Sequence, residues 1–122
     1  MTEPSPLARP GVFPGPAAVP FETVAWRDIH ETHHSGDTGE ALWRSHELGG
    51  TRVRMVTYSP GYLADHWCSR GHVLLVLEGS LTTELDDGRT VVLKAGDSYV
   101  VSDRMEAHRS RTDEGARLFI VD

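Results

Sequence analysis

From Ala41 onward the chain is a series of short β-prone runs separated by turn residues at regular intervals. Gly, Asp and Pro separate the runs every eight to twelve residues, for example at Gly49-Gly50, Pro60-Gly61 and Gly96-Asp97. The runs read ALWRSHEL, TRVRMVTYS, HVLLVLEGSLTTELDD, TVVLKAGDSYVVS and ARLFIVD. Because no helical period competes with this spacing, the sequence predicts an all-β sandwich or barrel.

One hairpin can be assigned from the sequence alone. The segment LTTELDDGRTVVL, residues 81–93, places Asp87-Gly88 between two alternating runs. An Asp-Gly pair favours the tight turns that join antiparallel strands. We therefore predict a β-hairpin centred on these two residues.

The run that starts at His72 is apolar on both faces. If His72 points into the barrel, Leu74 and Val76 do so too, because side chains alternate along a strand. The outward row then consists of Val73, Leu75 and Leu77. An outward apolar row needs cover from a second sheet, the N-terminal segment or another subunit. We predict a homodimer that uses this surface.

Proline is concentrated at the start of the chain, where residues 1–20 hold six of the seven prolines. Each proline fixes φ and removes a backbone donor, so this segment is predicted to be an extended Pro-rich N-terminal arm, with a disordered tail as the alternative. Residues 21–40 are predicted to form an N-terminal strand or turn followed by a polar loop. Residues 41–122 then form the β-barrel domain.

Three histidines, His30, His33 and His34, lie in the polar stretch HETHHSGDTGE. They resemble a metal cluster in composition, but no strand or helix is predicted to orient them. We therefore assign them to a solvent-exposed loop.

Composition narrows the class of partner. The 122 residues fit one domain, and a formal charge of −6 argues against a surface for nucleic acid or anionic membrane. The single cysteine cannot form an intramolecular disulfide, and no apolar segment approaches the roughly 18–20 residues of a membrane span. With no signal-peptide pattern at the N-terminus, the expectation is a cytoplasmic protein.

The chemistry is concentrated in DHWCSRGH, residues 65–72. His66 and Cys68 are two residues apart and share one face of an extended chain, and His72 begins the next strand after Gly71. His108, in another short run, can approach from across the barrel. Imidazole and thiolate suit borderline transition metals, so the pattern favours a metal site.

These residues resemble the first motif of the cupin superfamily, in which Gly, His-x-His, Glu and Gly follow at set intervals. His66 stands at the first His, Cys68 at the second and His72 at the Glu, and Gly79 closes the motif six residues later. The opening Gly is displaced by one position, at Gly61. More narrowly, the stretch is similar to small stand-alone cupins with an Asp-His-Trp-Cys-type signature.

A second cupin motif is recognisable in KAGDSYVVSDRMEAH. It begins at Gly96-Asp97 and ends at His108, the position of the usual fourth ligand, although the internal Pro-x-Gly is replaced by SDRMEA. The resemblance covers about residues 41–122. It implies a double-stranded β-helix, the jelly-roll barrel of cupins, and a metal held by His66, Cys68, His72 and His108.

The altered ligand set changes the metals that we expect. Replacing the carboxylate and gaining a thiolate moves preference toward Zn²⁺, Fe²⁺ or copper and away from Mn²⁺, with Fe(II) or Zn(II) as the expected ion. If Cys68 binds, four protein ligands can close a tetrahedral site; if it is a small buried hydrophobe, three histidines leave positions open. His72 has the alternative of a hydrogen-bonded core histidine.

The sequence leads to one principal function and two alternatives. The principal one is a metal-binding single-domain cupin that acts on a small molecule, as an oxygenase or as an isomerase or cyclase. The first alternative is a non-catalytic cupin that binds or senses a small molecule or metal. The second, a nucleophilic Cys68 with a histidine base, is disfavoured because side chains two apart on a strand do not converge. The predicted pocket residues are Tyr58, Tyr62, Leu74, Val76 and Tyr99.

Overall fold

The structure is a computed structural model that describes residues 19–122. The Pro-rich arm predicted for residues 1–20 lies almost entirely outside these residues. The described residues form eight strands and one short 3₁₀ turn, η2 (Trp26–Asp28). The strands are β1 (Thr32–Ser35), β2 (Glu40–Leu48), β3 (Thr51–Tyr58), β4 (His72–Leu85), β5 (Thr90–Lys94), β6 (Ser98–Val101), β7 (His108–Arg111) and β8 (Ala116–Val121). Within residues 19–122 no helix is long and apolar enough to cross a membrane.

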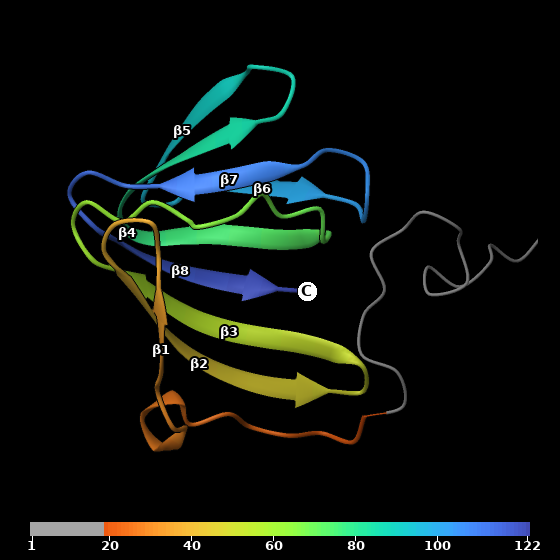
Figure 1. The fold of residues 1–122 in the computed structure, drawn as a ribbon. Coiled ribbons are helices and arrows are strands. Elements are labelled where there is room, and N and C mark those ends of the chain that lie inside the picture. Colours follow the sequence, from red (N-terminus) through yellow and green to blue (C-terminus); the bar gives the residue numbers. More distant parts are fainter. Residues whose placement is uncertain (1–18) are drawn as a thin grey trace, which may run out of the picture.

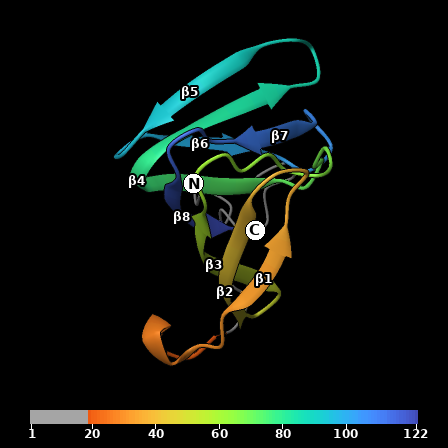
Figure 2. The same ribbon diagram turned by 60° about the vertical axis from the view of Figure 1, so that its left-hand side comes forward.

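All strand pairs are antiparallel, and the long strand β4 connects the two halves of the barrel. The strand order is β1-β2-β3-β8-β4-β5, with β6 and β7 also paired to β4. The first half of β4 pairs with β8 and β6, and the second half with β5 and β7. In Figure 1 the β4–β5 hairpin rises above the sheet of β1, β2, β3 and β8, and Figure 2 shows the same two layers from another side. The prediction of an all-β barrel is confirmed for the described residues.

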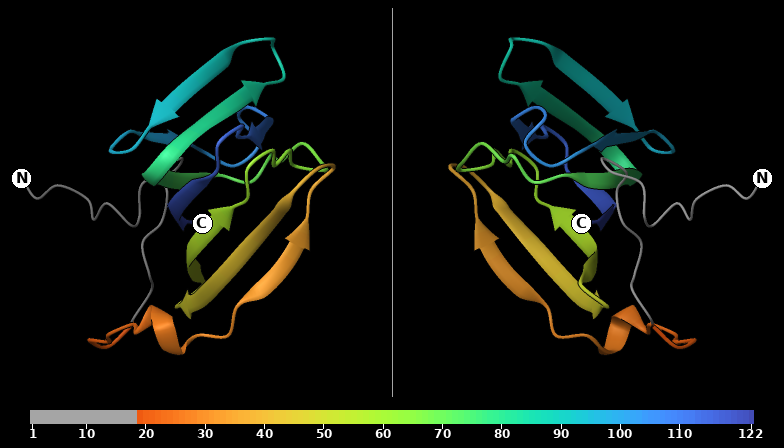
Figure 3. Two further views of the ribbon diagram at one scale, coloured as in Figure 1. Left: turned by 90° about the vertical axis from the view of Figure 1, so that its left-hand side faces the viewer. Right: turned by 90° about the vertical axis from the view of Figure 1, so that its right-hand side faces the viewer.

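A bend at Gly79 lets one strand serve both layers. The pairing of β4 with β8 shifts register between Val76 and Glu78, and Gly79 follows with φ at +77°. A Cβ at Gly79 would lie 2.1 Å from the carbonyl oxygen of Gly115, so only glycine fits there. The strand continues through Gly79 to Leu85. The two layers diverge from this bend, as the side views in Figure 3 show.

The core follows the alternation predicted for β4. His72, Leu74 and Val76 point inward and are 6%, 1% and 0% exposed. Val73 and Leu77 point outward, and each is 36% exposed. The inward chains pack with other buried aliphatic residues, namely Val56, Leu81, Leu93, Ala116, Leu118 and Ile120. The predicted hairpin is also confirmed, because β4 and β5 pair around the Asp87-Gly88 turn.

The prediction of a plain loop around His33 and His34 is wrong. Residues 32–35 form β1, which pairs with the start of β2, and His33 lies opposite Leu42. The ring of His34 stacks on Trp43 with centroids 3.7 Å apart and planes at 25°. Residues 32–35 are extended because they pair with β2, and their polar sequence gives no sign of this pairing. Upstream, the predicted strand or turn is the single turn η2, whose Trp26 packs edge-on against Phe119.

Candidate functional site

A cavity of about 250 Å³ opens at one end of the barrel. Its wall is formed by β2, β3, β7, β8, the start of β4 and the loop of residues 62–70. The loop reaches the barrel because Leu63 bridges to Thr38 and Arg111 and Cys68 bridges to His108. The motif residues therefore lie at the mouth of the cavity, next to the first residue of β4.

Two imidazoles meet at the inner end of this cavity. The rings of His72 and His108 have centroids 4.7 Å apart and are inclined at 70°. His72 Nε2 lies 2.7 Å from the hydroxyl of Tyr99, which fixes the ring from behind. Burial, and then the charge of neighbouring His108, lowers the pKa of His72 to about 4. His72 is therefore neutral at neutral pH.

The His108 ring is oriented by the backbone carbonyl of Glu106. Its Nδ1 lies 3.0 Å from the carbonyl oxygen of Glu106. Because a carbonyl only accepts, Nδ1 carries the proton and Nε2 keeps its lone pair. Both His108 Nε2 and His72 Nδ1 are buried and have no hydrogen-bond partner of normal geometry. Such unpaired buried nitrogens are uncommon, and an imidazole nitrogen with a free lone pair is a common metal ligand.

Cys68 lies beside His108 because the two residues exchange both backbone hydrogen bonds, at 2.8 and 2.9 Å. Their side chains are in polar contact. This contact raises the pKa of His108, and it lowers the pKa of the Cys68 thiol against the opposing effect of burial. The thiol is half-buried and lines the cavity.

His66 also lines the cavity, but it points toward solvent, with 73% of its side chain exposed. Its Nδ1 lies 2.7 Å from the Asp65 carboxylate, and this hydrogen bond lowers the pKa of Asp65. Trp67 faces away and is covered in part by the guanidinium of Arg109, 5.0 Å from the ring centre. Arg109 in turn donates to Glu84 at 3.0 Å.

The donors for a metal ion are present only in part. Within residues 19–122 no three His, Cys, Asp or Glu side chains are grouped so that they could hold a metal ion. The unpaired nitrogens of His72 and His108 fit two ligand positions. A third ligand from this chain would have to come from Cys68 or His66, which line the same cavity.

Three of the five predicted pocket residues line the 250 Å³ cavity, and the other two lie elsewhere. Tyr58 and Tyr62 line the cavity with rings stacked 4.1 Å apart, and Leu74 lines it from below. Val76 is fully buried in the core and lines none of the cavities described here. Tyr99 lies behind His72 and lines a second, smaller cavity of about 110 Å³.

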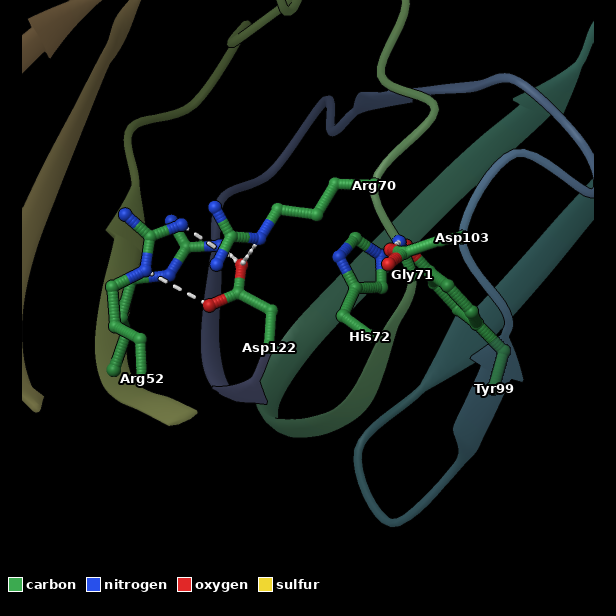
Figure 4. A network of polar contacts seen from close by, with 8 residues as sticks. Arg52, Arg70, Gly71, His72, Tyr99, Asp103 and Asp122 are labelled. Atoms are coloured by element: carbon green, nitrogen blue, oxygen red, sulfur yellow. Dashed lines mark hydrogen bonds and ion pairs between the residues drawn. The ribbon is translucent and has the colours of Figure 1, made fainter. Parts of the chain in front are cut away.

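A group of charged residues was not predicted from the sequence. The carboxylate of Asp122, 1% exposed, receives hydrogen bonds from Arg52 at 2.8 and 2.9 Å and from Arg54 at 2.9 Å. Arg70 Nε lies 3.7 Å from the same carboxylate. Figure 4 shows Arg52 and Arg70 reaching Asp122 close to His72. All four side chains line the cavity.

A weak signal for these arginines was available. Arg52 and Arg54 alternate with Val53 and Met55, so they share a face with the core residue Val56. Arginines on the inward face of a strand are unexpected unless they are paired or bind a ligand. The partner, Asp122, is 70 residues away from Arg52, and no local pattern reveals that contact.

The fold and the cavity define a small antiparallel β-barrel with an open cavity, whose lining is mostly apolar surface together with arginine and histidine side chains. A family model described as the cupin domain matches residues 54–122. The chain belongs to the cupin family, and the resemblance predicted from the two motifs is confirmed. No curated protein sequence matches the chain significantly.

Solved structures of low identity share the fold. One is a predicted oxalate decarboxylase from Thermotoga maritima, with a TM-score of 0.67 and 17% identity over 82% of this chain and 96% of that one. Another is ectoine synthase from P. lautus, with a TM-score of 0.67 and 18% identity over 83% and 76% of the two chains. A cupin-2 domain containing protein from Shewanella frigidimarina has a TM-score of 0.55 and 23% identity over 66% and 78%. At these identities the likeness concerns the fold.

Proposed function

We propose that this chain is a metal-binding cupin that acts on a small molecule held in the 250 Å³ cavity. The ion is a divalent transition metal, Fe(II) or Zn(II), and its ligands are His66, Cys68, His72 and His108. The observation that carries the proposal is that two buried ring nitrogens, His72 Nδ1 and His108 Nε2, lack a hydrogen bond of normal geometry, while the His108 side chain also contacts the Cys68 thiol.

The surrounding residues support this role by fixing the two imidazoles. Glu106 accepts the Nδ1 proton of His108, so the free lone pair is on Nε2. Tyr99 holds His72 at Nε2, which leaves Nδ1 directed away from the tyrosine. The lowered pKa of His72 keeps its imidazole neutral, as a ligand must be. A bound ion would supply Lewis-acid chemistry, or oxygen activation if it is iron.

Cys68 and His66 complete the proposed set in different ways. The Cys68 thiol already contacts His108, and its lowered pKa favours the thiolate that binds metals. His66 is held at the rim by Asp65, so it would have to turn inward. The predicted oxalate decarboxylase and the ectoine synthase that share this fold differ in their chemistry, so the fold alone does not define the reaction.

The alternative is a cupin that binds a small molecule without turnover. It is favoured by the absence, within residues 19–122, of three side chains grouped as metal ligands, and by the arginines around Asp122, which offer a ligand charged groups without a metal. In that case Cys68 is a packing residue, and the unpaired nitrogens hydrogen-bond to the ligand itself.

Metal analysis of untagged protein purified without oxygen distinguishes these functions. We expect near-stoichiometric iron or zinc, lost in His108→Ala and retained in His33→Ala. His33 is a suitable control because its side chain is 68% exposed and lies on β1, outside the cavity. Equal metal content in both variants would contradict the assignment of His108 as a ligand. No metal even after reconstitution would contradict the metal site and favour the cupin that binds a small molecule without turnover.

Cobalt substitution tests the cysteine separately. If Cys68 is a ligand, Co²⁺-loaded protein should show a thiolate-to-cobalt charge-transfer band that disappears in Cys68→Ser. A Co²⁺ protein without this band removes Cys68 from the ligand set but keeps the histidines. We further propose, with this function, that the protein is cytoplasmic and works as a homodimer.

A further inference from the structure

We propose that the ligand of the cavity is a small organic acid, whose carboxylate is bound by Arg54 and Arg70 and whose apolar body lies against Tyr58 and Tyr62. The inference rests on the cavity being the ligand site, as the proposed function holds. It does not depend on the metal.

The charge balance of the cavity is the first argument. Three guanidiniums, of Arg52, Arg54 and Arg70, surround a single carboxylate, that of Asp122. Among these four side chains, three positive charges face one negative charge. No other carboxylate lines the cavity among the residues that the structure describes. Because unbalanced charge in a partly buried site is unfavourable, the site favours an anion.

The donors still available are the second argument. Arg52 makes a two-pronged contact with Asp122, through Nε and one terminal nitrogen. Arg54 donates one hydrogen bond to Asp122 through a terminal nitrogen. Its side chain is 8% exposed, and its Nε is buried without a hydrogen-bond partner. Its guanidinium lies over the Trp43 ring at 4.4 Å, which fixes its plane. Arg54 therefore keeps hydrogen-bonding capacity that this chain does not use.

Arg70, at the mouth of the cavity, is the second arginine that can bind the ligand carboxylate. Its side chain is 54% exposed, and its 3.7 Å contact with Asp122 is longer than a hydrogen bond. Figure 4 shows it extending from the loop across the cavity toward Asp122, with His72 nearby. A guanidinium matches the two oxygens of a carboxylate in geometry. The remaining lining arginine, Arg109, also has a buried Nε without a partner, but its guanidinium donates to Glu84 and lies over the ring of Trp67, which faces away from the cavity.

The shape and lining of the cavity indicate the rest of the ligand. A volume of about 250 Å³ is below the roughly 300–1,000 Å³ of drug-sized sites, so the ligand is small. The stacked rings of Tyr58 and Tyr62 form one apolar wall, and Leu74 and Ile120, at 1% and 2% exposure, lie beneath. An acid with a planar apolar body uses both the arginines and this wall. Inorganic phosphate would use only the arginines.

Calorimetric titration with benzoate tests this inference, with benzamide as the uncharged control of the same shape. We expect benzoate to bind and benzamide to bind at least about tenfold more weakly, since a hydrogen-bonded charge is lost. Arg70→Gln should weaken benzoate about tenfold. The matched variant is Arg89→Gln, because Arg89 is 56% exposed, lines none of the described cavities and is likewise paired with carboxylates. It should leave the affinity unchanged.

Several results would overturn the inference. Equal affinities for benzoate and benzamide would show that the cavity does not select an anion. Equal benzoate affinities of the Arg70→Gln variant and the wild type would show that Arg70 does not bind the carboxylate. Phosphate that binds as tightly as benzoate, without shifting the amide signals of Tyr58 and Tyr62, removes the organic body. Failure of both benzoate and acetate to bind also overturns it. A protein that binds neither acid yet holds stoichiometric metal refutes this inference alone, and one that binds benzoate but takes up no metal refutes only the metal proposal.

Discussion

Asp122 is the residue whose charge organises one end of the barrel. It exchanges backbone hydrogen bonds with Arg52, and its carboxylate receives three side-chain hydrogen bonds from Arg52 and Arg54. Removing a single partner from a buried ion pair leaves the other charge without compensation. The network is therefore the most charge-sensitive part of the described structure.

We predict that Asp122→Asn lowers the free energy of unfolding by about 3–5 kcal/mol, because it leaves the guanidiniums of Arg52 and Arg54 unpaired. Urea denaturation measures this change. Asp113→Asn is the control, since Asp113 is exposed and should change stability by less than about 0.5 kcal/mol. Equal losses in the two variants would show that Asp122 is not a structural anchor.

The same carboxylate gives a pH dependence. Burial raises the pKa of Asp122, but the Arg52 hydrogen bond and the charges of Arg54 and Arg52 outweigh it, so the pKa lies below the ordinary value of 3.8. Below that value the unfolded chain binds the proton more readily than the folded one. The contribution is therefore complete above about pH 4 and is lost as the pH falls through the folded pKa. Urea denaturation between pH 3 and pH 6 should show a steeper acid loss in wild type than in Asp122→Asn.

At the scale of the element, the bend in β4 allows one strand to join both layers. Gly79 and Gly88 both have positive φ, +77° and +96°. They differ in their surroundings, because a Cβ at Gly79 would collide with the Gly115 carbonyl whereas nothing lies within 4 Å of a Cβ at Gly88. Substitutions at Gly79 and Gly88 can therefore be compared to distinguish the free-energy cost of backbone strain, which both share, from that of a steric clash between strands, which only Gly79 has.

We predict that Gly88→Ala costs about 1–2 kcal/mol, the cost of placing alanine in the left-handed region. Gly79→Ala should cost at least about 2 kcal/mol more, because β4 must also move away from Gly115. Thermal and urea unfolding of both variants provide the comparison. Similar losses would mean that the register shift beside Gly79 absorbs a side chain without disturbing the sheet.

Most of the strands could be predicted because their signal is local. The alternation that places Leu74 and Val76 in the core and the Asp87-Gly88 turn are both contained within a few residues. β1 could not be predicted, since its sequence THHS is polar and its order comes from pairing with β2 and from His34 stacking on Trp43.

The candidate site likewise contains residues that local motifs predict and contacts that they do not. His66, Cys68 and His72 belong to one short motif, so they could be found together, and His108 follows from the second motif. The contact between Arg52 and Asp122 joins positions 70 residues apart and has no sequence signature. Local spacing also could not show that His66 points to solvent while Cys68 and His72 both contact His108.

At the scale of the whole molecule, the outer face of β4 and β6 carries apolar side chains that the described residues leave exposed. Val73 lies directly opposite Val100 in the strand register, and they are 36% and 68% exposed. Leu77 on β4 and Val92 on β5 are exposed as well, at 36% and 59%. Because an exposed apolar face is unfavourable in water, the sequence-based prediction of a homodimer assigns this face to contact with a second copy of the chain.

We therefore expect sedimentation equilibrium to show a homodimer, and Val100→Lys to convert it to a monomer. A lysine at the centre of an apolar interface must give up its hydration without a partner, whereas in the monomer it stays in water. Stability of the fold should change by less than about 0.5 kcal/mol, because Val100 is a surface residue. Phe21→Lys is the control, since Phe21 is 97% exposed but lies before η2, outside the β4–β6 face. A monomeric wild type would contradict the homodimer, and a dimer that both variants leave intact would show that the subunit contact lies on another face.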